Sequence, residues 1–165
     1  MKLKEQEVEK EGMNKELYDL FIEMIKLEYN KSQFLKGAKF YCWTHGLEDY
    51  CRFFKNMMEQ CGKCKNDFIF YLLSRFEDIP EITIDAIKYD YKDAEETFVA
   101  FVEKEEQFVD LLERIVTKAK ELNDVNTMAF ALPILGKIDH IACRALEAVK
   151  AGKNPSALIQ YEIHW

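Results

Sequence analysis

Several polar side chains stand where the sequence otherwise repeats apolar residues at helical spacing. Three of them are carboxylates, and two are the thiols of a Cys-Gly-Lys-Cys sequence: Glu28, Glu106, Asp139, Cys61 and Cys64. A buried carboxylate costs free energy unless it is paired or holds a metal. Residues three apart lie on one face of a helix, which places the two thiols together. This set therefore predicts a metal site, past or present, in the core of a helical protein.

Each of these residues also has a simpler interpretation. Glu106 lies in a run of charged residues and could be on a solvated face, while Asp139 and His140 could form an ordinary polar pair on a helix. Cys61 and Cys64 could be small core thiols, because one Cys-x-x-Cys without a second one or a nearby His pair is a weak signal for zinc. The pair also lacks the strand-to-helix setting of redox Cys-x-x-Cys sequences.

Four long segments with apolar residues at steps of three and four would carry these side chains. They cover about residues 14–43, 47–76, 92–122 and 126–150. Each has about 25–30 residues, or roughly 40 Å at 1.5 Å per residue. Four amphipathic helices of similar length predict an all-α four-helix bundle. Pro133 lies inside the last segment and should kink it.

The links between the segments predict how the helices run. The turns near Gly46 and Asp124 are short, so each joins antiparallel neighbours. The middle link, residues 78–91, can span the whole bundle at about 3.3 Å per residue. Such a crossover leaves the second and third helices parallel. Asn154 as N-cap and Pro155 as the first residue predict a short fifth helix. Its apolar residues favour burial against the bundle or another subunit.

The chain thus divides into a charged N-terminal extension (1–13), a bundle (14–152) and a short C-terminal helix or tail (153–165). Its 165 residues favour one domain. With 23 Lys+Arg against 30 Asp+Glu, it lacks the basic block that nucleic-acid binding needs. It has no apolar run of about 18 residues and no apolar signal segment, so we expect a cytoplasmic protein that does not enter a membrane. Five cysteines without a secretion signal argue against a disulfide framework.

Over about residues 14–152 the sequence resembles the ferritin family, in its bacterial non-haem branch. The resemblance is carried by Glu28-Tyr29, Cys42-Trp43, His45-Gly46-Leu47-Glu48, Glu105-Glu106-Gln107, and residues 119–124 followed by Thr127 and Phe130. Ferritins oxidise Fe(II) at a two-iron site inside each bundle. The resemblance implies a ferritin-like bundle with one long crossover, iron as the bound metal, and self-association into a shell of about twenty-four subunits.

The resemblance also implies which residues would be ligands. Ferritins use a Glu on the first helix, a Glu-x-x-His on the second, a Glu on the third and a Gln or Glu on the fourth. Glu28 and Glu106 match the first and third, and Asp139 is the candidate for the fourth, although a one-residue slip would put Ile138 there. In the second helix Cys-Gly-Lys-Cys replaces the Glu-x-x-His. The carboxylate that bridges two irons and the imidazole are therefore both absent.

These departures lead us to expect an iron-binding or iron-storage cage with an altered di-iron site and slow or unconventional Fe(II) oxidation. Likeness to a ferroxidase does not by itself make the chain an enzyme. Thiolates favour softer or borderline metals, such as zinc or Cu(I), over iron. The alternative is a thiol-containing metal-binding or redox-sensing ferritin-like protein that does not mineralise iron. Ala129 and Leu132 stand where the pore that admits iron is usually acidic.

Overall fold

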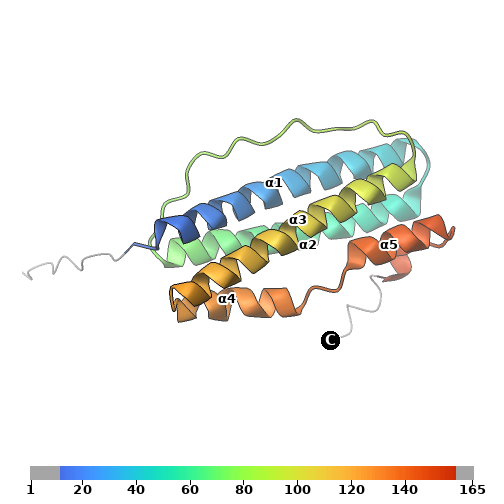
Figure 1. Ribbon diagram of the computed structural model, residues 1–165. Coiled ribbons are helices and arrows are strands. Elements are labelled where there is room, and N and C mark those ends of the chain that lie inside the picture. Colours follow the sequence, from blue (N-terminus) through green and yellow to red (C-terminus); the bar gives the residue numbers. More distant parts are fainter. Residues whose placement is uncertain (1–11, 159–165) are drawn as a thin grey trace, which may run out of the picture.

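The computed structural model describes residues 12–158, and all the regular structure within them is helical. Three long helices are α1 (Lys15–Thr44), α2 (Glu48–Ser74) and α3 (Ala94–Glu121). Two shorter ones, α4 (Val125–Gly136) and α5 (Ile141–Lys150), follow one another along the fourth edge (Figure 1). The 3-10 helix η1 (Pro155–Leu158) comes last. The predicted all-α helical bundle is confirmed.

The helices run in the directions that the link lengths predict. α1 is antiparallel to α2 and α3, and α2 and α3 are parallel to each other (Figure 1). Residues 75–93 form the crossover, which returns the chain along the outside of α1 to the start of α3 (Figure 1). α1 packs against both α2 and α3. Side chains from α1 and α3 therefore meet inside the bundle.

Asx residues begin the helices that frame the core. Asn14 accepts hydrogen bonds from two amides in the first turn of α1, and Asp93 accepts one from the Glu96 amide at 2.9 Å. Asp124 caps α4 through the Thr127 amide at 3.1 Å. Such caps satisfy backbone donors that a helix start leaves unpaired. Asp124 also pairs with Arg75 at 3.2 Å, which ties the start of α4 to the end of α2.

The apolar core consists of two clusters rich in aromatic rings. One is centred on Phe54 and Phe98, whose ring centroids lie 4.7 Å apart, and the other includes Phe21, Phe68 and Leu112. A polar layer lies between the two clusters. Among the described residues, the buried charged side chains are Glu28 and Lys31, and both belong to this layer.

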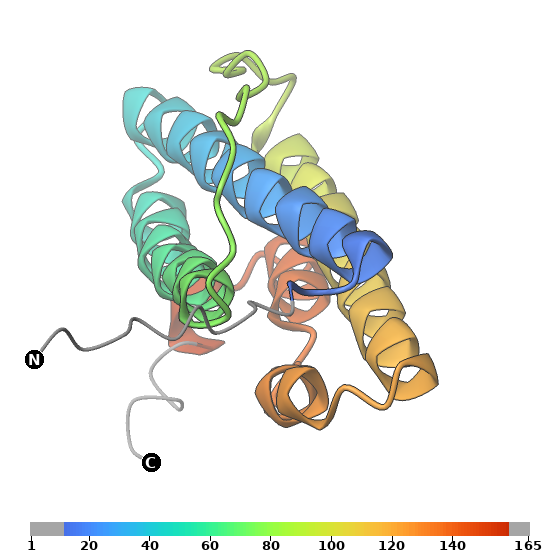
Figure 2. The same cartoon turned by 90° about the vertical axis from the view of Figure 1, so that its left-hand side faces the viewer.

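The fourth helix differs from the prediction of one helix kinked at Pro133. Pro133 lies inside α4, and the helix is interrupted at residues 137–140 instead. At the end of this interruption His140 adopts a left-handed backbone conformation, with φ 55°. The Asp139 carboxylate accepts a hydrogen bond from the Ile141 amide at 3.1 Å, which starts α5. Local side-chain capping of this kind competes with helix continuation, and it offsets α5 from α4 (Figure 2).

The C-terminal segment starts where the sequence predicts. The Asn154 side chain accepts from the Ser156 amide at 2.8 Å, and the Ser156 hydroxyl donates to the Asp49 carbonyl at 2.7 Å. This bond fixes η1 at the start of α2. The rest of the predicted fifth helix, residues 159–165, and most of the N-terminal extension, residues 1–11, lie outside the described residues. No helix of the described chain combines the length and the apolar character that a membrane span requires.

Gly37 sets how closely the crossover approaches α1. A Cβ added there would lie 2.1 Å from the Lys88 carbonyl oxygen, whereas a Cβ added at Gly62 would meet nothing within 4 Å. We expect Gly37→Ala to displace the crossover and lower the free energy of unfolding by about 1–3 kcal/mol. Gly62→Ala should raise it by about 1 kcal/mol, because alanine is the better helix former. Urea unfolding of both variants tests this, and effects of the same sign would contradict it.

Candidate functional site

The polar layer is an ion-pair triad formed by Glu28, Lys31 and Glu105. The ammonium of Lys31 lies 2.9 Å from Glu28 Oε1 and 3.0 Å from Glu105 Oε1. Lys31 also lies over the ring of Phe108, 4.5 Å from its centroid. Glu28 is 0% exposed and Lys31 is 5% exposed, while Glu105 reaches the site from a partly exposed position. A protein side chain thus supplies a cation between two carboxylates.

Burial and pairing have opposing effects on the charges of this triad. Burial raises the pKa of Glu28, and the ammonium of Lys31 opposes that rise. Burial alone would lower the pKa of Lys31, but Glu28 and Glu105 outweigh it and raise that pKa above its ordinary range. Glu28 Oε1 has no hydrogen-bond partner among the described residues, so the close ammonium is what compensates its charge. Lys31 is therefore a fixed positive charge in the core.

Two thiols lie beside the triad on α2. Cys61 Sγ donates to Glu28 Oε2 at 3.4 Å and lies 3.3 Å from the Glu28 carbonyl oxygen. Cys64 is one turn further along the helix and is half-buried. Burial, and next the charge of Glu28, raise the pKa of Cys61, and the same two causes raise the pKa of Cys64 to about 12. Both thiols therefore hold their protons at neutral pH in the absence of a metal.

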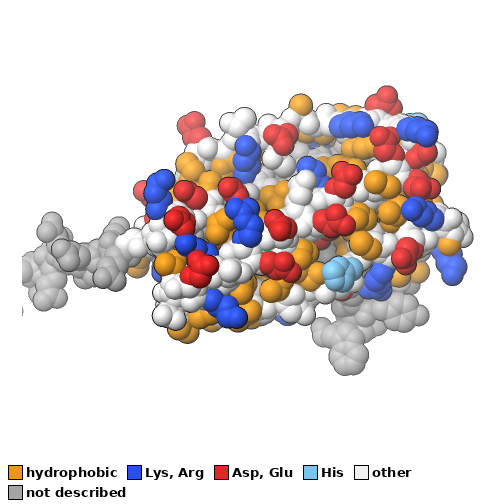
Figure 3. Space-filling view, in the orientation of Figure 1, with side chains coloured by type: hydrophobic (Ala, Val, Ile, Leu, Met, Phe, Trp, Pro, Cys, Tyr) orange, Lys and Arg blue, Asp and Glu red, His pale blue; other side chains and the backbone are white. Residues whose placement is uncertain are grey.

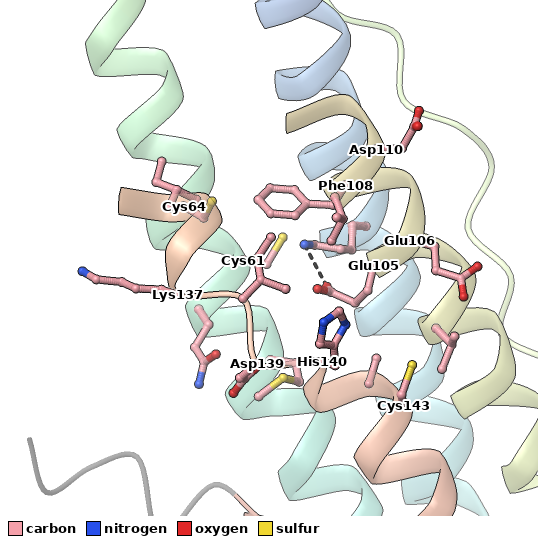
Figure 4. A pocket seen from close by; sticks show the side chains of 18 of the residues that line it. Cys61, Cys64, Glu105, Glu106, Phe108, Asp110, Lys137, Asp139, His140 and Cys143 are labelled. Atoms are coloured by element: carbon pink, nitrogen blue, oxygen red, sulfur yellow. Dashed lines mark ion pairs between the residues drawn. The ribbon is translucent and has the colours of Figure 1, made fainter. Parts of the chain in front are cut away.

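A pocket of about 650 Å³ opens beside the triad (Figure 4). It lies between α2, α3 and the interruption between α4 and α5. Lys31, Cys61 and Phe108 line its inner part, and Asp139 and His140 line it from the interrupted fourth helix. Figure 4 shows the ion pair to Glu105 as a dashed line near the middle of this pocket. The pocket gives the triad and the thiols a path to solvent.

The structure brings together only part of the predicted metal set. Glu28 and Cys61 are in contact, and Cys61, Cys64, Glu106 and Asp139 line one pocket, the last two from exposed positions. Among the residues that the structure describes, no group of three or more His, Cys, Asp or Glu side chains is arranged to hold a metal ion. A metal site formed by all five predicted side chains therefore stays a prediction.

Glu106 is placed differently from the prediction. It is exposed, and Glu105 is the residue of α3 that reaches Glu28 through Lys31. Successive residues of an α-helix point about 100° apart, so α3 cannot direct both carboxylates into the core. Glu105 therefore faces Lys31, the exposed position of Glu106 agrees with its interpretation as a residue on a solvated face, and its role as a ligand stays a prediction.

Asp139 is also outside the core. It is exposed, lies 3.9 Å from Arg144, and caps α5 through the Ile141 amide. The interruption at residues 137–140 is the physical reason, because it removes Asp139 from the helical stripe on which the prediction placed it.

Sequence reasoning did not identify Lys31 or the pocket-lining Cys143. Lys31 did carry a signal, since Met24, Glu28, Lys31 and Leu35 follow one another at steps of four, three and four. Residues at these steps share one helix face. A lysine on the same buried stripe as a glutamate predicts an internal ion pair, because a buried charge needs a partner.

Comparisons with known proteins agree with the fold. The Ferritin-like domain family matches residues 19–144. This chain belongs to that family. The fold of this ferritin-like chain is similar to the crystal structure of a PmFTN variant soaked in iron, with a TM-score of 0.71 and 19% identity. That match covers 82% of this chain and 91% of the other. A comparison with curated protein sequences gives no match.

The surface of this ferritin-like chain mixes charges with apolar side chains. On the face seen in Figure 3, acidic and basic side chains are interspersed, and apolar side chains show between them. Four large apolar residues are at least 65% exposed, namely Trp43, Phe70, Phe76 and Val125. Single exposed apolar side chains are ordinary. These four residues are the most exposed of the large apolar side chains that the structure describes.

Proposed function

We propose that this chain is an iron-binding or iron-storage subunit of a ferritin-like shell, and that its own bundle does not oxidise paired Fe(II). The observation that carries the proposal is Lys31, whose ammonium lies about 3 Å from both Glu28 and Glu105. These carboxylates are the hard oxygen donors that the core has to offer. Lys31 is paired with both of them and occupies the space between them.

Chemistry at a pair of metal ions requires free carboxylates that hold both ions close together. A lysine ammonium carries three donors and no acceptor, so it cannot be a ligand. Its fixed charge also repels a divalent cation at the distances found here. Cys61 adds no hard donor, because its ligand atom is a soft sulfur, and its thiol donates to Glu28. The chain's own residues thus keep the core closed to hard cations.

Family membership supports iron as the metal that the assembled protein handles. The PmFTN variant with the similar fold was soaked in iron. The exposed apolar residues support association with further copies, and we propose a shell of about twenty-four, located in the cytoplasm. Iron held by such a shell would be oxidised slowly or at another position, because the bundle centre is blocked by Lys31.

Aerobic loading with Fe(II), followed by size separation, tests this function. We expect a peak of shell size that retains iron, with an oxidation rate close to that of Fe(II) in buffer alone. Rapid oxidation with an early phase of two Fe(II) per chain would overturn the proposal that Lys31 prevents oxidation inside the bundle. A shell-sized peak that retains no iron would overturn the proposal of iron storage. It would not contradict the proposal that Lys31 prevents oxidation inside the bundle.

A further inference from the structure

Three of the five cysteines line the pocket beside the triad: Cys61, Cys64 and Cys143. The two on α2 are one helical turn apart, a spacing that places Cβ atoms about 5–6 Å apart. Two metal–sulfur bonds of about 2.3 Å in a line span about 4.6 Å. Rotation of the side chains alone can therefore bring both sulfurs onto one ion. We infer that Cys61 and Cys64 form a two-coordinate site for a soft monovalent metal ion, with Cu(I) as the matching ion.

The ligands that remain free at this position select the class of metal. Lys31 holds the carboxylates of Glu28 and Glu105, and the other Asp, Glu and His residues of the pocket are exposed, so sulfur is the buried donor left at this position. Thiolates prefer Cu(I) to hard divalent ions. Zinc needs about four ligands, and the described residues contain no group of three or more His, Cys, Asp or Glu side chains arranged for a metal. Two thiolates suffice only for an ion of low coordination number.

The charge of the site suits a monovalent ion held by two thiolates. Binding replaces two S–H bonds with two S–Cu bonds and releases two protons to solvent, without any change in oxidation state. The product carries a net charge of −1. The Lys31 ammonium lines the same pocket as both thiols and supplies a positive charge beside the anionic product.

The pocket supplies the route to the site. Cys64 is half-buried and Cys61 is 4% exposed, so an ion from solvent reaches Cys64 first. Gly62 lies between them, with nothing within 4 Å of an added Cβ. The other two cysteines differ, because Cys42 is buried in an apolar cluster and Cys51 packs at the edge of that cluster.

Competition for Cu(I) under anaerobic conditions tests the inference on the full chain, with bicinchoninate as the coloured competing chelator. We expect the protein to withdraw one Cu(I) per chain. Cys61→Ser and Cys64→Ser should each weaken binding by more than about 100-fold, since losing a ligand costs more than losing a ligand's hydrogen-bond partner. Cys51→Ser, on the same helix but outside the pocket, is the matched control and should bind like the unaltered chain.

Two results would overturn the assignment. One is Cu(I) binding that survives Cys61→Ser combined with Cys64→Ser, and the other is binding that is lost in Cys143→Ser. X-ray absorption of the unaltered protein with Cu(I) is independent of how any variant folds. It should show two sulfur neighbours, and nitrogen or oxygen neighbours would contradict the site. The inference does not depend on the proposed function, because Fe(II) loading is measured without copper.

Discussion

Replacing Lys31 with methionine is expected to lower the free energy of unfolding by about 3–5 kcal/mol, the usual cost of removing one partner from a buried ion pair. The change leaves Glu28 fully buried without the ammonium that lies 2.9 Å from it. Methionine fills a similar volume, so the loss of unfolding free energy measures the effect of the missing charge and not that of a cavity. Urea unfolding at pH 7 measures it. Lys26→Met, at an exposed position of the same helix, is the matched control.

The pH dependence of the Lys31→Met variant tests the cause. Burial raises the pKa of Glu28 in the intact protein, and removing Lys31 removes the effect that opposes it. The folded variant then binds a proton more readily than its unfolded chain, so its stability rises as the pH falls toward the ordinary range of Glu. Adding Glu28→Gln to Lys31→Met should recover most of the loss. A loss that is independent of pH and persists in the double variant would contradict the ion-pair explanation.

The second large effect is a gain of Fe(II) oxidation. Cys61→Glu and Cys64→His restore the Glu-x-x-His pattern on α2, and Lys31→Leu removes the ammonium from between Glu28 and Glu105. We expect the triple variant to oxidise two Fe(II) per chain in a rapid first phase, because two-metal chemistry needs bridging carboxylates that are free. Stopped-flow absorbance after mixing with Fe(II) measures this phase.

The variant with both α2 changes and an intact Lys31 is the decisive control. It carries every restored ligand but retains the internal cation, so we expect it to remain slow. If that variant oxidised Fe(II) as fast as the triple variant, Lys31 would not be what prevents oxidation. The residues that replace the Glu-x-x-His on α2 would then be sufficient to explain slow oxidation. If neither were fast, an element outside the triad would limit oxidation.

Most of the fold could be predicted from the sequence, because it follows from strong and repeated signals. The steps of three and four extend over long segments, and each long helix buries such a stripe. The crossover follows from chain length alone, since only the middle link is long enough to span the bundle. The interruption after Gly136 was missed, because the apolar pattern continues through it. The Ile141 amide donates a hydrogen bond to the Asp139 carboxylate, and this local bond competes with continuation of the helix. The spacing of apolar residues gives no sign of such a bond.

The site was less predictable, since it depends on single-residue register and on pairs from different helices. Glu105 and Glu106 are adjacent and identical in type, so only the rotation of α3 against α1 decides which one faces Lys31. Glu28 was placed correctly because apolar residues surround it on one stripe. Lys31 belongs to the same stripe, but a lysine is ordinarily read as a surface residue, and its buried position depends on two carboxylates that come together only in the folded chain.

The spacing of Glu28 and Lys31 has a consequence for the order of folding. They are one turn apart on α1, so their attraction is available as soon as that helix forms. Glu105 lies on α3, 74 residues after Lys31 in the chain. When α1 docks on α2, it carries its own counter-charge, and the nascent hairpin does not desolvate a lone carboxylate. The closing of α3 over this hairpin then adds the second carboxylate to an ammonium already in place. We therefore expect loop closure across the crossover, and not the transfer of an unpaired charge, to limit the formation of this layer during folding.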